Sequence, residues 1–349
     1  MYPNNPFTLM YGVSSLSLVS REDSINYIIN SFINDKAMFM YLITGIRGCG
    51  KTVLLRETST KLGKENDWIV VDINSQGKII TSLANKLFDE SKERKLLSGW
   101  SLSINLPYLT LTKEQSEQVN DPEIIAEKIL RKLHDNNKKV LITIDEVTNT
   151  NDFREFVNFY QHLLGSGIIV FLLMTGLKEN INNIINDKAM TFLSRAPKID
   201  LEPLSLPNVA LEYQRFLNVT KDEAIKMALM TNGYAFAYQV LGYIMYENKC
   251  DKVDKNIIEK YDAYLWANGY TKFWNDLTIN EKKFLIGLAN SKKGSKEEIC
   301  SVSELKETNY SQYRRRLLEK GLIIVKGYDK LDFVLPRFRE FINYAKEFD

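Results

Sequence analysis

Apolar residues recur along the first two hundred positions in short unbroken runs separated by amphipathic segments. The runs are short enough for buried strands and lie at 38–44, 68–74, 140–147, 167–176 and 198–205. The amphipathic segments between them predict helices at 24–33, 51–62, 79–97, 122–134 and 153–164. Only residues 99–112 are ambiguous, as an inserted hairpin or a loop. Strands alternating with helices indicate an α/β domain with a parallel sheet covered on both faces.

Beyond residue 206 the pattern becomes helical, and no strand is predicted before residue 322. The last part reads as a helix at 277–290 with Thr278 as its N-cap, then helices at 301–309 and 310–321. A hairpin at 322–336 and a closing helix at 337–348 follow. This order is typical of a winged helix-turn-helix. We therefore expect three domains, at 1–205, 206–275 and 276–349.

A glycine-rich segment, YLITGIRGCGKTVLLRE (residues 41–57), joins the first predicted strand to a helix. It fits the pattern G-x-x-x-x-G-K-[ST], in a context where packing alone requires neither the lysine nor the threonine. Such a loop wraps its amides around an oligophosphate at a helix N-terminus. We expect Lys51 to reach the β- and γ-phosphates of ATP and the Thr52 hydroxyl to bind Mg²⁺. The predicted nucleotide contacts are Gly45, Ile46, Arg47, Gly48, Cys49, Gly50, Lys51, Thr52 and Val53.

The thiol of Cys49 has two interpretations. The helix N-terminus and Lys51 would favour a reactive thiolate, which bound ATP would protect. Alternatively, Cys49 is a small buried residue chosen for its fit.

The third predicted strand ends in Asp145 and Glu146. Uncompensated carboxylates are costly at the end of a buried strand, so a cation is expected there. We assign Asp145 to Mg²⁺ and Glu146 to activation of the attacking water. Thr175 ends the next strand and either hydrogen-bonds the γ-phosphate or the water, or simply caps the strand. Arg195 is either a phosphate-binding arginine, acting in its own subunit or in a neighbour, or a surface residue.

The segment YSQYRRRLLEKG (310–321) carries three consecutive arginines. With Leu317 and Leu318 on the inner side, the outer face suits phosphate contacts and guanine recognition. Residues 276–349 contain 15 lysines and arginines against 12 acids, a local charge of +3, so protein docking and a structural role stay open. The predicted DNA contacts are Gln312, Arg314, Arg315, Arg316 and Lys326.

Composition narrows the setting of the protein. Its 349 residues carry 46 basic and 44 acidic side chains, which excludes a generic polyanion binder. Three scattered cysteines argue against a disulfide framework and favour a reducing compartment. The longest apolar run, 168–174, is too short to span a bilayer, and the N-terminus lacks the charged region of a signal peptide. We expect a cytoplasmic protein without membrane contact.

The chain resembles the AAA+ ATPases of the origin-recognition or initiator-like class, within the group that includes archaeal ATPases and the signal-transducing STAND NTPases. The matching stretches are FTLMYGVSSLSLVSRED, ITGIRGCGKTVLL, LITIDEV, TFLSRAPKIDLEPLS, TNGYAFAYQVLGY and YRRRLLEKGLI with LDFVLPRFREF. The resemblance implies a five-stranded core in AAA+ order, a helical lid, Thr175 as a polar sensor, and Val19 to Asp23 near the adenine. Two departures stand out. Ser20 replaces a usual glycine, and NGYAFAYQ lacks the arginine that initiator-type lids often supply.

These observations predict an ATP-binding and ATP-hydrolysing switch that docks on DNA through a winged helix, in replication initiation, partition or mobile-element maintenance. One alternative is a STAND-like signalling or defence ATPase whose winged helix binds a protein or its own ATPase domain. Another is a transposition accessory ATPase. A protein partner or self-association is compatible with each of them.

Overall fold

The computed structural model describes residues 4–10, 15–34, 38–93, 121–327 and 330–347. The ambiguous segment at 99–112 lies outside these residues. The chain divides into two compact units. A sheet unit comprises residues 21–44 and 51–200, and a helical unit comprises residues 1–20, 45–50 and 201–349. Residues 45–50, the glycine-rich loop, therefore group with the helical unit.

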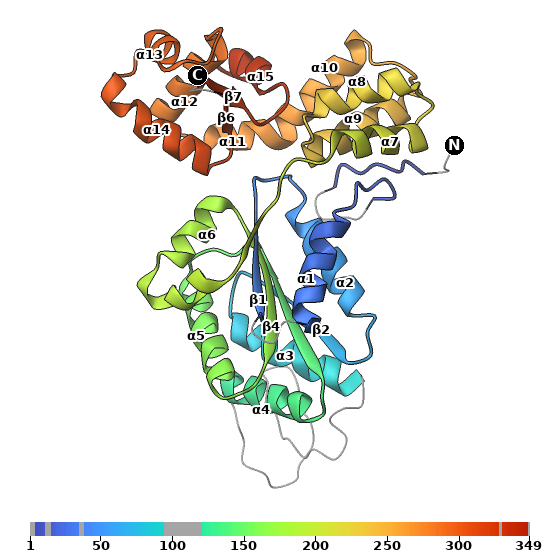
Figure 1. Cartoon of the computed structure of the whole chain (residues 1–349), viewed down its shortest axis with the longest axis vertical. Helices are drawn as coiled ribbons and strands as arrows, with labels where there is room; N and C mark the ends of the chain where they lie inside the picture. Colours follow the sequence, from blue (N-terminus) through green and yellow to red (C-terminus); the bar gives the residue numbers. More distant parts are fainter. Residues whose placement is uncertain (1–3, 11–14, 35–37, 94–120, 328–329, 348–349) are drawn as a thin grey trace. The chain divides into compact units, whose positions relative to one another are not determined.

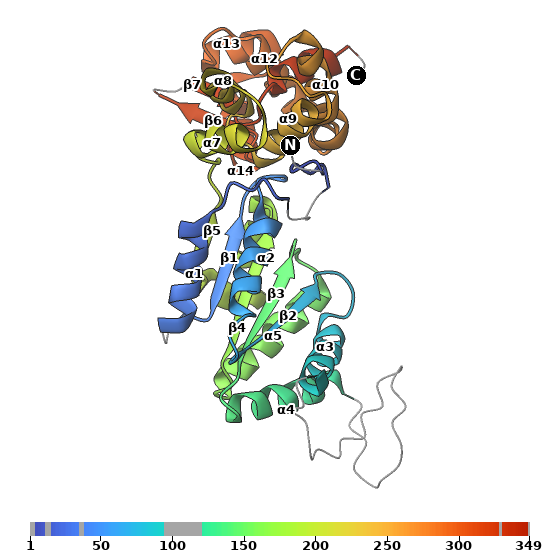
Figure 2. The same cartoon turned by 90° about the vertical axis from the view of Figure 1, so that its right-hand side faces the viewer.

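The sheet unit is built on five parallel strands in the order β2-β3-β4-β1-β5, with β5 and β2 at opposite edges (Figure 2). Their bounds are β1 (Met40–Thr44), β2 (Trp68–Asn74), β3 (Lys139–Asp145), β4 (Val170–Gly176) and β5 (Lys198–Asp200). The sequence prediction of a five-stranded parallel sheet in AAA+ order is confirmed. Strand β5 is much shorter than the predicted 198–205.

Helices cover both faces of this sheet because its strands bury alternate side chains on opposite sides. On one face lies α1 (Figure 1), whose Phe32 packs against the rings of Tyr41, Trp68 and Phe171. On the other, Leu42, Ile142 and Leu172 belong to an apolar core that also includes Phe153 and Phe156 of α5. The helices are α1 (Glu22–Asn34), α2 (Lys51–Leu62), α3 (Ile79–Glu93), α4 (Pro122–Asp135), α5 (Asn151–Gly165) and α6 (Lys178–Ile185), with a 3₁₀ segment, η1 (Lys188–Arg195).

The helical unit contains two groups of helices with one continuous apolar core. The first group is α7 (Leu206–Phe216), α8 (Lys221–Thr231), α9 (Ala235–Glu247) and α10 (Lys255–Leu265). A turn of π-helix, η2 (Trp266–Tyr270), and α11 (Thr271–Asn275) lead to the second group (Figure 1). This comprises α12 (Ile279–Asn290), α13 (Lys296–Ser303), α14 (Glu307–Glu319), β6 (Ile323–Lys326), β7 (Lys330–Phe333) and α15 (Phe338–Ala345). The proposed boundary at residue 275 thus lies within one unit, and the three-domain division stays a prediction.

The second group shows why one helix prediction is wrong. The segment 301–309 is not a helix, because α13 starts earlier and ends at Ser303. The Ser295 side chain accepts a hydrogen bond from the Glu298 N–H and starts the helix, and Glu304, in the left-handed region at φ +57°, ends it. The predicted N-cap Thr278 is confirmed, in a reciprocal capping box with Glu281.

Residues near the N-terminus pack on α9, which the sequence did not predict. Phe7 is buried against the rings of Tyr213 and Tyr238. A Cβ on Gly242 would lie 2.4 Å from the Phe7 ring, so only glycine admits this approach. The Gln239 side chain binds the same segment through the Thr8 N–H at 2.9 Å.

Candidate functional site: the acidic strand end, the glycine-rich loop and the basic helix

The carboxylate of Asp145, at the end of β3, is held from two sides. The Thr52 hydroxyl, in the first turn of α2, donates to its Oδ2 at 2.7 Å. The Thr175 hydroxyl, in β4, donates to its Oδ1. Because β3 and β4 are adjacent and parallel, their carboxyl ends lie at one edge of the sheet. The two residues assigned to Mg²⁺ are therefore brought together, with Thr175 as a second partner.

Glu146 follows with an exposed side chain and a left-handed backbone at φ +55°. Its N–H donates to the Thr175 hydroxyl at 3.0 Å, and the Val147 N–H donates to the Thr175 carbonyl at 2.8 Å. A non-glycine residue in this region of φ is uncommon, and such strain concentrates at functional sites. Thr175 thus holds the turn in which Glu146 is exposed. The sequence left two roles open for Thr175, hydrogen bonding to the γ-phosphate or the water and capping of the strand, and this contact combines features of both.

The donor set at this strand end fits Mg²⁺. The ion prefers oxygen ligands and takes one or two carboxylates, with substrate phosphates and water completing the shell. Asp145 and Thr52 offer one carboxylate and one hydroxyl oxygen in contact. Among the described residues no cluster of three or more His, Cys, Asp or Glu could hold a metal by itself. Lys51, at the start of α2, is buried.

The glycine-rich loop makes its own set of contacts within the helical unit. The Arg47 carbonyl accepts from the Tyr234 hydroxyl at 2.8 Å, and the Gly48 carbonyl accepts from the Phe236 N–H at 3.1 Å. Ile46 packs closely on Gly321. A Cβ added to Gly321 would lie 2.2 Å from the Cγ2 atom of Ile46. Sequence reasoning considered NGYAFAYQ only for an arginine and missed Tyr234. No pattern in the sequence pairs a tyrosine hydroxyl with a loop carbonyl.

Cys49 and Arg47 complete the loop. The Cys49 side chain is 6% exposed and packs against Gly45, which favours the interpretation of a buried residue chosen for its fit. The Arg47 Nη1 atom is buried, with no hydrogen-bond partner among the described residues. Val53, the last predicted contact, lies half-buried in α2.

Arg195 is the last residue of η1 and precedes β5. Its side chain is exposed and has no hydrogen-bond or ion-pair partner within the described part of the chain. The structure therefore leaves both its phosphate-binding and its surface interpretation as predictions.

Helix α14 presents the predicted basic face. Gln312, Arg315 and Arg316 are exposed, while Leu317 is buried. Arg315 lies 3.8 Å from Glu319, a loose i,i+4 pair. Arg314 is half-buried, and its Nε has no partner among the described residues.

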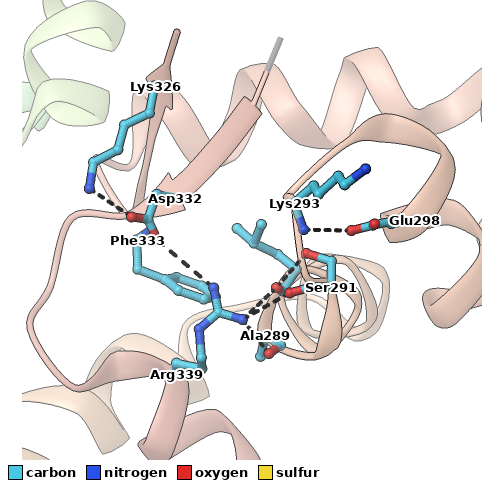
Figure 3. Close-up of polar contacts among 9 residues, drawn as sticks. Ala289, Ser291, Lys293, Glu298, Lys326, Asp332, Phe333 and Arg339 are labelled. Carbon is cyan, nitrogen blue, oxygen red and sulfur yellow. Dashed lines mark hydrogen bonds and ion pairs between the residues drawn. The ribbon is translucent and has the colours of Figure 1, made fainter. Parts of the chain in front are cut away.

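An ion pair joins the two strands of the hairpin, and Arg339 of α15 binds the end of α12 (Figure 3). The Lys326 Nζ lies 2.7 Å from Asp332 across the two strands. Burial alone would raise the pKa of Asp332, but the hydrogen bond from Lys326 helps hold it below its ordinary value. The Arg339 guanidinium donates to the carbonyls of Leu288, Ala289 and Ser291 at the end of α12. Lys326, a predicted DNA contact, thus already has an acidic partner.

Comparisons with known proteins support an ATPase domain. A family model described as an ATPase domain predominantly from Archaea matches residues 18–173, and a model for a domain of unknown function (DUF8462) matches residues 267–342. The Walker-type ATPase PABY2304 of Pyrococcus abyssi is 16% identical, with 93% of this chain and 96% of that chain covered at a TM-score of 0.65. The ORC2 protein of Aeropyrum pernix, solved as ADPNP-ADP complexes, is 13% identical, with 98% of each chain covered at a TM-score of 0.62. No curated protein matched.

At these identities the two structures show a shared fold. Within the part of the chain that the structure describes, no helix is both long and apolar enough to cross a membrane.

Proposed function

Since residues 18–173 carry a domain of the archaeal ATPase family and the chain has the fold of the initiator-like AAA+ ATPases, we propose that the protein is an ATP-driven switch that docks on DNA through its C-terminal residues. The observation that carries the ATPase part is the Asp145 carboxylate between Thr52 and Thr175. It brings the hydroxyl of the loop motif against the acid at the end of β3, as Mg²⁺ bound to ATP requires.

Each residue of this strand end has a separate task in the proposal. Thr52 and Asp145 hold Mg²⁺, which neutralises charge on the phosphates when it is bound. Lys51 pairs with the β- and γ-phosphates. The exposed Glu146 carboxylate orients the attacking water and accepts its proton. Thr175 keeps Asp145 and the Glu146 backbone in place through its single hydroxyl.

The DNA part of the proposal rests on the exposed face of α14. Arg315 and Arg316 are positioned to meet phosphates or guanine edges, and Gln312 lies on the exposed side of the same helix. The order α12, α13, α14, hairpin matches that of a winged helix-turn-helix, in which the third helix enters the major groove. Lys326 would exchange Asp332 for a phosphate at the edge of the interface.

One observation favours a second function, in which the C-terminal residues bind protein. Gly321, directly after α14, packs on Ile46 of the glycine-rich loop. A domain that contacts its own nucleotide loop suits the STAND-like alternative, and the local charge of +3 is modest for a DNA-binding surface.

Fluorescence anisotropy with a labelled random-sequence duplex separates the two functions. The full chain is titrated at a series of salt concentrations, with no nucleotide, with ADP and with ATP plus Mg²⁺. We expect binding that weakens steeply with salt, and an affinity that ATP changes by about fivefold or more. A chain that hydrolyses ATP but binds no duplex at low salt would refute the DNA part of the proposal and favour the protein-docking alternative. A chain that binds neither ADP nor ATP would refute the switch itself.

Arg195 adds a test of self-association. If its exposed guanidinium completes the site of a neighbouring copy, ATPase activity per molecule should rise with protein concentration in the native protein. It should stay flat in Arg195→Ala.

A further inference from the structure

Residues at the start of α9 donate hydrogen bonds to carbonyl oxygens of the glycine-rich loop. Tyr234 immediately precedes the helix and is 4% exposed. Its hydroxyl donates to the Arg47 carbonyl at 2.8 Å, and two residues later the Phe236 N–H donates to the Gly48 carbonyl at 3.1 Å. Both contacts lie inside the helical unit, to which loop residues 45–50 belong.

These bonds decide which way the loop amides face. A trans peptide is planar, so its N–H points opposite to its C=O. The Arg47 carbonyl faces Tyr234, and the N–H of Gly48, in the same peptide, therefore faces away from α9. Among the described residues this N–H has no hydrogen-bond partner. An unpaired amide directed out of a glycine-rich loop is the donor that a phosphate oxygen accepts from.

The fit between the loop and the tyrosine is close. Gly48 has φ +76°, in the left-handed region, and a Cβ on it would lie 2.4 Å from the Tyr234 hydroxyl. The space beside this glycine is thus occupied by the oxygen that holds the Arg47 carbonyl. Any rotation of the Arg47–Gly48 peptide would break that hydrogen bond and leave a polar group without its partner.

We infer that Tyr234 is a positioning residue for nucleotide binding, whose hydroxyl holds the Arg47–Gly48 peptide so that the Gly48 amide faces the phosphates. The inference rests on the proposed binding of nucleotide to this loop. It assigns to a tyrosine of the helical unit a task that neither the loop motif nor the acidic strand end performs. Tyr234 acts through the backbone and does not itself contact the nucleotide.

The test is Tyr234→Phe, which keeps the ring and removes only the hydroxyl. Tyr213→Phe is the matched control, because the Tyr213 hydroxyl is also buried and also donates to a backbone carbonyl, that of Tyr238, at 2.9 Å. Tyr213 makes no contact with the loop that the structure describes. Both variants and the native chain are titrated calorimetrically with ADP and with ATP plus Mg²⁺, at a temperature at which circular dichroism shows each of them folded.

We expect Tyr234→Phe to weaken ADP and ATP binding about tenfold and Tyr213→Phe to leave both unchanged within about twofold. The Michaelis constant for ATP should rise by a similar factor while kcat changes little, because orientation of the loop serves the ground state and the transition state alike. If Tyr234 had a purely structural role, both variants would have a lower melting temperature. The Michaelis constant would then not rise selectively in Tyr234→Phe.

Two results would overturn the inference. One is native nucleotide affinity in Tyr234→Phe, and the other is an equal loss in Tyr213→Phe. Neither is confused with failure of the proposed function, in which the native chain itself would bind no nucleotide.

Discussion

The acidic end of β3 and the basic face of α14 are both charged, but the fold satisfies them to different degrees. Asp145 has both oxygens occupied by hydroxyl groups from two neighbouring elements. On α14, Arg315 has only a loose contact with Glu319, and the Arg316 side chain has no partner among the described residues. The first arrangement is preorganised by the fold itself, which suits the proposed ATP hydrolysis. The second is exposed to solvent, so changes at the proposed DNA interface should have graded and salt-dependent effects.

The strongest way to break this comparison is Lys51→Ala. Lys51 is buried at the start of α2, and in the proposed function its removal deprives the phosphates of a paired charge. We expect nucleotide affinity to fall about 100-fold or more, measured by calorimetric titration with ATP and Mg²⁺. Lys61→Ala, an exposed lysine of the same helix that pairs with Glu22, serves as the control and should bind normally. Equal affinity in Lys51→Ala and the native chain would refute the assignment of the site.

Glu146→Gln separates hydrolysis from binding at the same strand end. The amide keeps the size of the side chain but cannot accept a proton from water. We expect kcat to fall by about 100-fold or more while ATP affinity is kept, measured by phosphate release under saturating ATP. Glu155→Gln, exposed on α5, removes the same charge from the sheet unit and should be neutral. Turnover at the native rate in Glu146→Gln would remove the base and leave the binding site intact.

The sequence predicts the sheet unit more closely than the helical unit, for physical reasons. Strand β2 carries a mostly apolar run in which Trp68, Ile69, Val71 and Ile73 are buried, so its predicted bounds are the observed ones, Trp68–Asn74. Helix α2 is likewise predictable, because the glycine loop precedes it and Gly63 follows it. The error at 301–309 arises because Ser295 and Glu304 set the ends of α13 by cap geometry, which apolar spacing does not show.

The same difference applies to the candidate sites. The loop motif and the acidic pair are local patterns, and the structure brings Thr52, Asp145 and Thr175 into contact. Tyr234 and Phe7 bind segments more than a hundred residues away in sequence, so no local pattern predicts their contacts. The wrong length of β5 has a similar cause, since an edge strand ends where its single neighbour β1 ends.

The carboxylate of Glu281, in α12, sharpens the comparison. It is held by hydrogen bonds, whereas Arg315 and Arg316 of α14 are exposed. Glu281 is buried and accepts from the Thr278 N–H at 2.8 Å and from Lys320, just after α14, at 3.0 Å. Burial alone would raise the pKa of Glu281, but these bonds hold it below its ordinary value. We expect Glu281→Gln to destabilise α12 and the end of α14 by about 1.5–3 kcal/mol, measured by hydrogen exchange of their amides.

The pH dependence of that change has a definite sign. A carboxyl group with a lowered folded pKa stabilises the protein above its unfolded pKa, and this contribution is lost as the pH falls through the folded value. The difference between native chain and Glu281→Gln should be constant from about pH 7 to about pH 5, and shrink below about pH 4.5. A difference that grows on acidification would show that the charge of Glu281 is not what stabilises the capping box.

The smallest expected effect is on the exposed face of α14, in the double variant Arg315→Ala with Arg316→Ala. Removing one arginine–phosphate interaction should reduce the slope of log affinity against log salt by about 0.9, so the slope should fall by roughly 2 if both arginines touch phosphates. If one arginine instead binds a base edge, the affinity cost at that position should be about 1–3 kcal/mol and restricted to particular sequences. Anisotropy titrations on random and defined duplexes distinguish these cases. Arg314 is left unchanged because it is half-buried, and its removal would disturb packing as well as charge.

Lys252→Ala combined with Lys255→Ala is the matched control. It removes the same charge from the same unit, and Lys255 has a loose i,i+4 contact with Glu259 at 3.8 Å, the same distance as that between Arg315 and Glu319. A generic electrostatic effect would change the slope of log DNA affinity against log salt equally in both double variants. An interface on α14 would change that slope only in the arginine variant. ATP affinity should be native in both, because no described hydrogen bond or ion pair joins either pair to loop residues 45–50. A fall in ATP affinity in the arginine variant would instead mean that α14 acts on the loop through Gly321 and Ile46, which lie in contact. In that event the protein-docking function would replace the DNA-binding one.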